Sequence, residues 1–455
     1  MMITTDAQSV LTARGMKRRM AMCTIKVDTT KAIGKIKPMH GGGQPPLGGK
    51  GNNGLFHYLT EAGIPYSRLH DVGGLFGGST YVDIPNIFRN FDADVNDPAS
   101  YDFAFTDFLI TSLMDAGVEP YFRLGITIEV HSTIRTYYTD PPKDYDKWAS
   151  ICEHVIAHYT EGWANGFCYD ITYWEIWNEP DNLYRRYAPQ MWSGTPEEYY
   201  RLYDVAAKHL KARFPKIKIG GYSSCGFNAL TAQNVSEEKA WLYQYFIDFF
   251  HGFLQYVREH GSPFDFFSWH TYEDTRTTLV WEQYVADTLK EYGFEHVENH
   301  ITEWDPFVEE YGTAHHSAEV AGMMLAMQNR TPAVLCIYDM RANTVPYCPL
   351  FDVKSKEPIH AYYSMVAFNH LYRLGNQVAL TVDTEDLYAV AATDGRYHAL
   401  MISNLTGTAQ ELTLEGVAME HAHVYVIDDR RLLSWAPNAR TINKNTVMLI
   451  EWQDA

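Results

Sequence analysis

The sequence predicts an α/β protein in which a (β/α)8 TIM barrel is followed by a C-terminal antiparallel β-sandwich domain. Two patterns carry this prediction. Between residues 35 and 370, short runs of consecutive apolar residues alternate with longer helical segments, as buried parallel strands alternate with the helices that cover them. Beyond residue 370, short strand-like runs follow one another with turn residues between them, which is typical of an antiparallel sandwich.

Eight apolar runs are the candidate barrel strands, at residues 36–39, 66–70, 118–124, 172–177, 217–221, 264–270, 297–301 and 333–338. The segments between them have the length of helices, and Thr195 followed by Pro196 is typical of a helix start. An open doubly wound sheet is the rival architecture. It is disfavoured because the Gly41–Gly43 run lacks the spacing of a nucleotide-binding fingerprint, so we interpret that run as a flexible loop.

The same patterns divide the chain into four regions. Residues 1–21 are polar and hold several methionines, and we interpret them as a disordered leader or a cloning scar. Residues 22–34 begin with an alternating strand that we expect to join the sandwich, residues 35–370 form the barrel, and residues 371–455 form the sandwich. The opening residues lack the apolar segment of a secretory signal, so we expect a cytoplasmic location.

The composition disfavours several classes of function. A net charge of −19 argues against a nucleic-acid partner, and no apolar run reaches the length of about 18 residues that a membrane span needs. The six cysteines lack the spacing of a zinc site or a disulfide framework, so we expect free thiols in a reducing compartment. Aromatic residues make up 14% of the chain, which suits stacking on the apolar faces of sugar rings.

Two glutamates stand at the predicted ends of two core strands. The run 172–177 stops at Asn178-Glu179-Pro180, where proline ends ladder pairing, and the run 297–301 is followed by Thr302-Glu303-Trp304. Barrel enzymes carry their catalytic groups at the carboxyl ends of the strands. Cleavage of a glycosidic bond needs one carboxylic acid to protonate the leaving oxygen and a second carboxylate to attack or stabilise the anomeric carbon. The pair therefore predicts a glycoside hydrolase.

Other strand ends bring further polar side chains to the same face. Taken singly, a histidine or arginine at such a position is more often a structural partner, and we interpret Glu175, in mid-strand, as a paired barrel residue. The convergence of six strand ends nevertheless favours a substrate site. Its candidate substrate-binding residues are Arg68, His70, Asn178, His270, Tyr272, Trp304, Tyr338 and Asp339.

The motifs around these residues resemble glycoside hydrolase family 39, the family of β-xylosidases and α-L-iduronidases, in the barrel clan with catalytic glutamates on strands four and seven. The similar segments lie between roughly residues 35 and 370, at 66–70, 116–122, 141–148, 174–181, 269–272 and 302–304. The resemblance implies a retaining mechanism with Glu179 as acid/base and Glu303 as nucleophile. It also implies that Asn178, His70, His270 and Tyr272 bind the sugar.

The sequence departs from that family's pattern at single positions, with Asp71 in place of glycine and Asp181 in place of asparagine. A larger departure follows Tyr338. No glutamate occurs there before Asp352, whereas xylosidases of the family use glutamates near this point to hold sugar hydroxyls. We therefore expect a sugar pocket remodelled by Asp339, Arg341 and Asn343.

The leading hypothesis is a retaining exo-glycosidase acting on plant pentose oligosaccharides, a β-xylosidase. Within the same class, an α-L-arabinofuranosidase or arabinobiosidase and an α-L-iduronidase-like enzyme are alternatives. A non-catalytic carbohydrate-binding barrel is the alternative from another class, disfavoured because both glutamates are present. We expect no cofactor and no metal, since the adjacent His315 and His316 would point in different directions on a helix. The expected partner is an oligosaccharide, without nucleic acid or membrane, and a homo-oligomer is compatible with the sequence.

Overall fold

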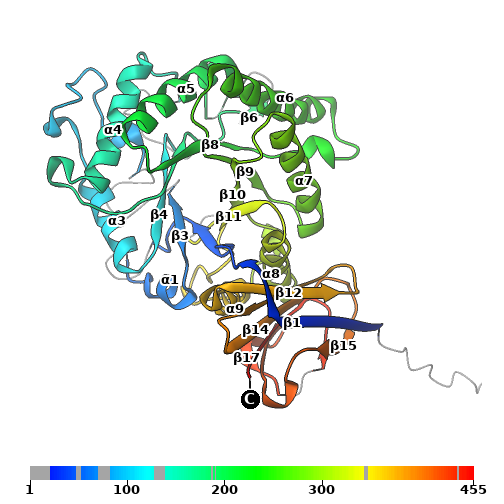
Figure 1. The fold of residues 1–455 in the computed structure, drawn as a ribbon. Helices are drawn as coiled ribbons and strands as arrows, with labels where there is room; N and C mark the ends of the chain where they lie inside the picture. The colour runs from blue at the N-terminus through cyan, green and yellow to red at the C-terminus, as the bar shows by residue number, and fades with distance from the viewer. Residues whose placement is uncertain are drawn as a thin grey trace, which may run out of the picture.

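The computed structural model describes residues 21–47, 53–69, 82–127, 139–185, 188–189, 191–342, 347–437 and 440–454. Within them the predicted fold class is confirmed. Figure 1 shows a ring of parallel strands surrounded by helices, with a second sheet packed beside α8 and α9. The early strand β1, although it precedes the barrel in the sequence, lies in that second sheet.

The barrel is closed, with the neighbour order β10-β11-β2-β3-β4-β5-β8-β9. Its strands are β2 (Gly41–Gly43), β3 (Tyr66–Leu69), β4 (Glu119–Leu124), β5 (Tyr173–Ile176), β8 (Lys218–Ser224), β9 (Phe266–Thr271), β10 (Glu298–Trp304) and β11 (Pro332–Ile337). The helices that cover it are α1 (His57–Ala62), α3 (Ala104–Asp115), α4 (Tyr145–Thr160), α5 (Pro196–Arg213), α6 (Glu237–His260), α7 (Thr275–Glu291), α8 (Ala314–Gln328) and α9 (His360–Leu374). The short α2 (Ile84–Ile87) and the two-stranded β6 (Leu183–Arg185) and β7 (Ala188–Pro189) lie in loops at the carboxyl end.

The first barrel strand corrects the interpretation of the glycine run. Gly41–Gly43, which we expected to be a flexible loop, forms β2 and pairs with β11 and β3, whereas residues 36–39 lie outside any strand. A Cβ atom on Gly41 would stand 2.6 Å from the Leu335 carbonyl oxygen, and one on Gly42 would stand 2.3 Å from Sδ of Met340. The neighbouring strands lie so close here that a larger residue would meet the Leu335 backbone or Met340. Because glycine is uncommon within strands, the sequence pattern indicates a loop instead of a strand.

The second sheet contains nine strands in the order β17-β16-β19-β14-β13-β12-β1-β15-β18. Their bounds are β1 (Ala21–Lys35), β12 (Asn376–Val382), β13 (Leu387–Thr393), β14 (Tyr397–Asn404), β15 (Gln410–Glu415), β16 (His423–Asp428), β17 (Arg431–Trp435), β18 (Thr441–Ile442) and β19 (Thr446–Gln453). All neighbours pair antiparallel except β1 and β15, which pair parallel. One face joins the core of the barrel domain, through residues such as Met401 and Leu449, and the other encloses a separate apolar core that includes Ile25 and Leu400.

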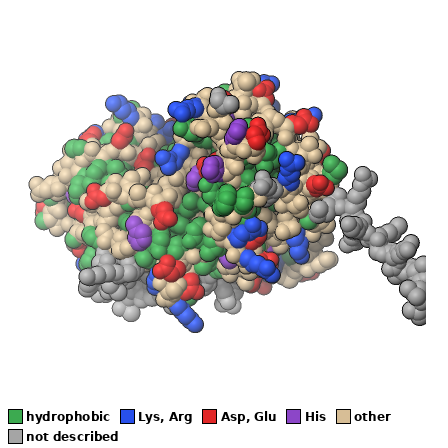
Figure 2. Space-filling model, turned by 90° about the horizontal axis from the view of Figure 1, so that it is seen from below, with side chains coloured by type: hydrophobic (Ala, Val, Ile, Leu, Met, Phe, Trp, Pro, Cys, Tyr) green, Lys and Arg blue, Asp and Glu red, His purple; other side chains and the backbone are tan. Residues whose placement is uncertain are grey.

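Local signals fix the start of α5 as the sequence predicts. Thr195 accepts a hydrogen bond from the Glu198 backbone N–H, and the Glu198 side chain accepts one from the Thr195 backbone N–H, which completes a capping box. None of the helices in the described parts of the chain is both long and apolar enough to cross a membrane. On the face shown in Figure 2, acidic and basic side chains are interspersed with hydrophobic ones instead of gathering into a patch of one sign.

Candidate active site

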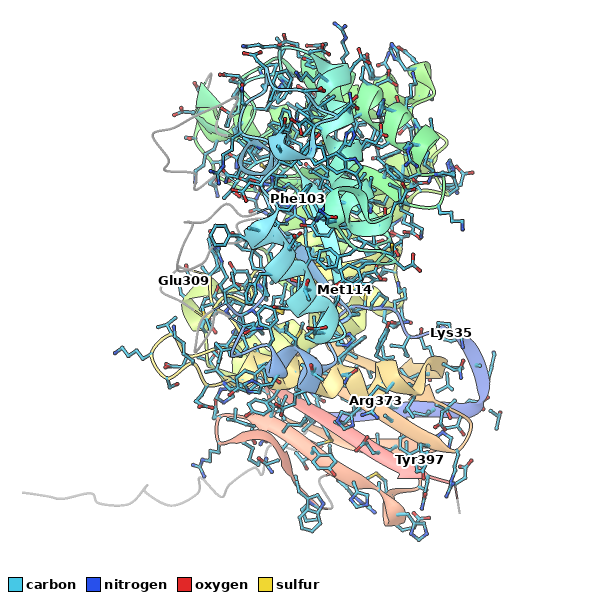
Figure 3. The ribbon with its side chains drawn as sticks, turned by 90° about the vertical axis from the view of Figure 1, so that its left-hand side faces the viewer. Lys35, Phe103, Met114, Glu309, Arg373 and Tyr397 are labelled. Carbon is cyan, nitrogen blue, oxygen red and sulfur yellow. The ribbon has the colours of Figure 1, made fainter. Side chains whose placement is uncertain are left out.

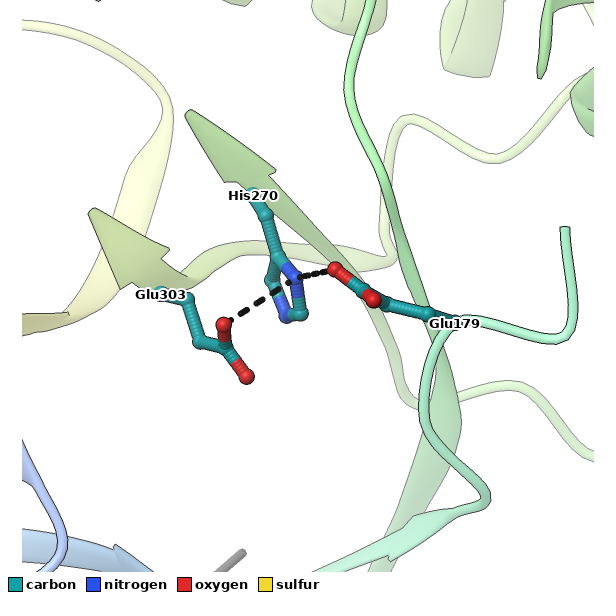
Figure 4. A group of neighbouring side chains, drawn as sticks. All are labelled: Glu179, His270 and Glu303. Atoms are coloured by element: carbon teal, nitrogen blue, oxygen red, sulfur yellow. Dashed lines mark hydrogen bonds and ion pairs between the residues drawn. The ribbon is translucent and has the colours of Figure 1, made fainter. Parts of the chain in front are cut away.

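Glu179, His270 and Glu303 meet at the carboxyl end of the barrel (Figure 4). Glu179 follows β5, the fourth barrel strand, His270 lies in β9, and Glu303 lies in β10, the seventh strand. Nδ1 of His270 is 2.7 Å from Oε1 of Glu179 and 3.5 Å from Oε2 of Glu303. One oxygen of each glutamate and this histidine lie within 4.8 Å of one another. The two carboxylates are therefore close enough for direct attack, since an intervening water needs roughly 6.5–9.5 Å.

Glu303 is held by two donors. Nη1 of Arg68 donates to its Oε1 at 2.8 Å, and the hydroxyl of Tyr272 donates to its Oε2 at 2.8 Å. A guanidinium remains charged at any working pH, so the contact with Arg68 favours the ionised form of Glu303. Withdrawal of the Tyr272 hydroxyl from water, together with the charge of Glu303, raises the pKa of Tyr272 well above its usual range, so the hydroxyl stays a donor.

Arg68 joins four side chains beneath the pocket. It is fully buried, and besides Glu303 it donates to Oε2 of Glu175 at 2.8 Å, Oδ1 of Asn178 at 2.6 Å and Oγ of Ser223 at 2.9 Å. Burial disfavours the charged guanidinium, but the carboxylates of Glu175 and Glu303 outweigh burial and raise its pKa. The bond to Asn178 fixes the orientation of the carboxamide next to Glu179.

Glu179 reaches the mouth of the barrel through a strained turn. Trp177 and Glu179 have positive φ angles of 72° and 43°, a region that residues other than glycine seldom adopt. The surroundings hold this backbone in place: the Trp177 N–H donates to the Leu124 carbonyl, and the indole donates to the Met191 carbonyl at 2.9 Å. Nδ2 of Asn182 donates to Oε2 of Glu179 at 2.5 Å. With 14% of its side chain exposed, Glu179 is the more accessible of the two glutamates, since Glu303 exposes 5%.

Asp181 lies two residues beyond Glu179 and is fully buried. Its carboxylate accepts a hydrogen bond from the Ser224 hydroxyl at 2.9 Å, and the Cys225 backbone N–H lies 3.3 Å from both of its oxygens. Burial, reinforced by the charge of Glu179, raises the pKa of Asp181 to about 7. The site thus contains a third carboxyl group whose ionisation is opposed by its surroundings.

The segment after β11 forms another wall of the site. Asp339 is buried, and both of its oxygens accept from Arg341, through the backbone N–H at 2.7 Å and through Nε and Nη2 at 2.8 and 2.6 Å. Nη2 of Arg341 also donates to the Tyr338 hydroxyl at 3.1 Å. The rings of Tyr272, Tyr338 and Tyr347 lie 5.3–6.4 Å apart and form an aromatic cluster above Glu303. Both carboxylate oxygens of Asp339 are therefore engaged by Arg341.

The structure brings most of the predicted residues together. Arg68, Asn178, Glu179, His270, Tyr272 and Glu303 form one connected network, and the buried Trp304, Tyr338 and Asp339 lie at the adjoining strand ends. His70 and Asn343 lie outside the described residues. Glu175 is paired with Arg68, and Arg123 pairs with Asp83 at 2.8 Å. Contact of any of these side chains with a sugar stays a prediction.

Sequence reasoning missed Ser223 and Asn182, and gave Asp181 no role. Ser223 is the hydroxyl partner of Arg68, and Asn182 holds Glu179. A signal for Asn182 exists, because the turn after Pro180 returns a residue three positions on toward Glu179. Ser223 carries no such signal, since it reaches Arg68 across 155 residues of sequence.

Glu179, His270 and Glu303 are also the group with metal-ligand spacing in the described parts of the chain. The donor set of two carboxylates and an imidazole would suit a divalent transition metal. Arg68, however, already places a permanent positive charge against Glu303, and the Nδ1 atom of His270 is engaged by Glu179. The residues fit an acid–nucleophile pair better than a cation site.

Comparison with known proteins decides the family. Residues 57–319 match the family model described as glycosyl hydrolases family 39. The chain belongs to that family. The β-xylosidase of Geobacillus stearothermophilus is 24% identical to this chain over 286 residues, in a comparison that covers 57% of this chain and 50% of that one. The chain spans half or less of the length of the β-xylosidases it matches.

Solved structures share the fold of this family 39 chain. A glucosidase from Croceicoccus marinus superposes with a TM-score of 0.77 at 18% identity, covering 96% of this chain and 99% of that one. A monomeric β-xylosidase from Caulobacter crescentus superposes with a TM-score of 0.67 at 16% identity, covering 94% and 99%. At these identities the superpositions establish the architecture alone.

Proposed function

We propose that this protein is a retaining exo-glycosidase that removes pentose units from plant oligosaccharides, a β-xylosidase. The observation that carries the proposal is the pair Glu179 and Glu303, with oxygens within 4.8 Å of each other at the ends of the fourth and seventh strands of a family 39 barrel. This separation suits direct attack by one carboxylate on the anomeric carbon. The matching relatives named as β-xylosidases support the choice of substrate.

In the first step Glu303 attacks the anomeric carbon while Glu179 protonates the leaving oxygen, which gives a glycosyl-enzyme ester and a free alcohol. The environments support this division of roles. Glu303 accepts from the charged Arg68 and from Tyr272, which favours a carboxylate ready to attack. Glu179 contacts an imidazole and an amide and is the more exposed of the two glutamates, so it is placed to exchange a proton with the leaving group and with water.

In the second step water attacks the anomeric carbon of the glycosyl-enzyme while Glu179 takes its proton, and the bond from that carbon to Glu303 breaks and releases the Glu303 carboxylate. The bond from Tyr272 to Oε2 of Glu303 would shift as that oxygen loses and regains charge. Asn178, oriented by Arg68, lies where an amide could donate to the sugar 2-hydroxyl. Two inversions at the anomeric carbon give net retention.

The alternative substrates differ from a β-xyloside in the ring or in a single substituent of the sugar. An arabinofuranosidase would need a furanose-shaped pocket, an iduronidase would need a cation for a carboxylate, and a glucosidase, as in the Croceicoccus relative, would need room for a hydroxymethyl group. Arg341 is already engaged by Asp339, which argues against a uronide clamp. Hydrolysis rates on aryl β-xylosides, α-L-arabinofuranosides, β-glucosides and uronides test this choice. We expect the xyloside to have the highest kcat/KM, and a leading rate on any other glycone would overturn it.

The division of roles has its own test. Glu179→Ala should keep its first step on aryl glycosides with good leaving groups and accumulate glycosyl-enzyme, because the second step lacks its base. Added azide, a small anion that needs no base, should restore turnover of this variant and give a glycosyl azide of retained configuration. Azide rescue of Glu303→Ala with retained configuration, and none of Glu179→Ala, would reverse the assignment.

We also propose a cytoplasmic location, which the lack of disulfide-framework spacing among the cysteines supports. The oligomeric state stays a prediction that sedimentation velocity tests.

A further inference from the structure

A second polar cleft lies away from the glutamates. It has a volume of about 520 Å³ and is bounded by the end of α9, by β14, by β16 and by β19. Barrel helices run antiparallel to the strands, so the end of α9 lies at the amino end of the barrel, opposite Glu179 and Glu303. Figure 3 shows Arg373 on α9 and Tyr397 on the neighbouring sheet, where Tyr397 begins β14. The cleft is thus no extension of the active site.

The polar side chains of the cleft have few partners within the described residues. Arg373, His421, His423 and Gln453 make no side-chain hydrogen bond or ion pair there, although all four line the cleft. His398 is 3% exposed; its Nδ1 has no hydrogen-bond partner, and its Nε2 lies 3.1 Å from Asp454. A buried imidazole nitrogen without a partner costs free energy unless a ligand or water satisfies it.

The charges of the cleft favour a neutral ligand. Besides four histidines, the cleft is lined by one permanent positive charge, on Arg373, and by two carboxylates, on Asp394 and Glu451. Glu451 is in turn held by Nδ1 of His370 at 2.7 Å. This balance disfavours a phosphate or another anion. The metal-ligand spacing found at the active site is not repeated here among the residues that the structure describes.

The mixture of hydrogen-bond donors and acceptors that line the cleft suits a sugar. Hydroxyl groups both donate and accept, and the cleft offers donors on Arg373 and Gln453, acceptors on Asp394 and Glu451, and imidazoles that do either. Tyr397 is 46% exposed and lines the cleft, and a sugar ring can stack on the face of its ring that the Arg396 guanidinium does not cover. We propose that this cleft binds a short neutral saccharide, and that it holds a pentose chain outside the catalytic site. The choice of a pentose chain, though not the site itself, rests on the proposed function.

Retardation in gels that contain soluble xylan tests the site. The experiment uses Glu303→Ala protein, so that the polysaccharide is not cut. We expect the further changes Arg373→Ala and Tyr397→Ala together to reduce retardation at least 5-fold, and Tyr397→Phe, which keeps the ring, to retain it. Trp435→Ala is the matched control, because Trp435 is 64% exposed on the same sheet but does not line the cleft. Xylotriose soaked into crystals should occupy the cleft.

Three results would overturn the inference: unchanged retardation in the Arg373→Ala/Tyr397→Ala protein, equal loss in the Trp435→Ala control, or displacement of the polysaccharide by inorganic phosphate, which would indicate an anion site. Hydrolysis of an aryl β-xyloside is measured in parallel, with Glu303 intact. It should change less than 2-fold in the Arg373→Ala/Tyr397→Ala enzyme. Absence of hydrolysis by the unaltered protein would contradict the proposed function, and xylan retardation would still report on the cleft.

Discussion

The two ends of the barrel use the same residue types for opposite purposes. At the amino end, Glu298 accepts from Lys218, from Tyr173 at 3.1 Å and from His300 at 3.3 Å. At the carboxyl end, Glu303 accepts from Arg68, from Tyr272, and lies near His270. Each end therefore has a glutamate with a cation, a phenol and an imidazole. What differs is the neighbour: Glu303 has a second carboxylate, Glu179, within 4.8 Å, and no such carboxylate–imidazole group surrounds Glu298 among the residues that the structure describes.

The two glutamates therefore differ in how their surroundings treat ionisation. Burial disfavours the ionised form of Glu298, but the bonds from His300 and Lys218 outweigh it and lower its pKa to about 2. Its charge is constant and its role is to hold strands together. At the other end the carboxylates crowd one another, and the neighbouring Asp181 has its pKa raised to about 7. Carboxyl groups this close oppose one another's ionisation, and such opposition suits acid/base chemistry.

Matched substitutions at the two ends of the barrel should differ most in their effect on catalytic activity. Glu303→Gln should reduce kcat/KM on an aryl β-xyloside at least ~10⁴-fold, because an amide cannot form the glycosyl ester. Glu298→Gln, the matched change at the amino end, should alter it less than about 3-fold, since Glu298 lies far from the reacting atoms. A comparable loss in both variants would show that the barrel as a whole, and not its carboxyl end, was damaged.

The sequence predicts the barrel and the two glutamates because both depend on local signals. The proline in Asn178-Glu179-Pro180 marks the end of a strand in the sequence itself. Barrel topology then places Glu303, at the end of another strand, on the same face as Glu179. The strand β2 could not be found in this way. Gly41 and Gly42 are selected by the lack of space near Leu335 and Met340, and glycine is otherwise typical of loops.

The hydrogen-bond partners of the site residues could not be predicted from the sequence, for a different reason. Arg68 was expected to bind substrate, yet its donors go to Glu175, Asn178, Ser223 and Glu303. Sequence places a side chain at a strand end but does not say which of several neighbouring acceptors it meets, since those acceptors come from three other segments, β5 with its following turn, β8 and β10. Asp339 shows the same limit, because its oxygens turn back to Arg341.

Removing the cation from each glutamate should cost unequal amounts of stability at the two ends. Arg68→Met should lower the free energy of unfolding by about 3–5 kcal/mol, because it leaves the buried Glu175 and part of Glu303 without a cation. Lys218→Met at the amino end should cost no more than about 1 kcal/mol, since 36% of that side chain is exposed and water screens the pair. Urea denaturation measures both. Equal costs would mean that burial does not distinguish the two ends.

A smaller effect should appear as a pH dependence at the carboxyl end. The pKa of Asp181 in the folded state, about 7, is above its value near 4 in the unfolded chain, so the folded state loses stability as pH rises between those values. Asp181→Asn removes this loss. We expect the variant to gain about 1–3 kcal/mol over the unaltered protein at pH 8 and almost nothing at pH 4. A gain that is independent of pH would show that Asp181 does not titrate in this range.

The smallest effect has the opposite sign, at the amino end. Glu298 has a folded pKa of about 2, below its unfolded value near 4.3, so its contribution is full above that value and is lost as pH falls toward 2. Glu298→Gln should therefore cost about 1–2 kcal/mol at pH 7 and nearly nothing at pH 2. Denaturant unfolding of both variants is measured across pH. Relative to the unaltered protein, the Asp181→Asn variant should gain stability and the Glu298→Gln variant should lose it as pH rises, and the same pH dependence in both would contradict the difference between the two ends.

The central claim is that Glu179 and Glu303 act as acid/base and nucleophile in direct displacement. It is tested most directly by ¹H NMR of the first product released from an aryl β-xyloside in D₂O. Two successive inversions predict that β-xylose appears first and that the α-anomer grows in only as the sugar mutarotates. Appearance of α-xylose first would require a water between the carboxylates and would contradict the account.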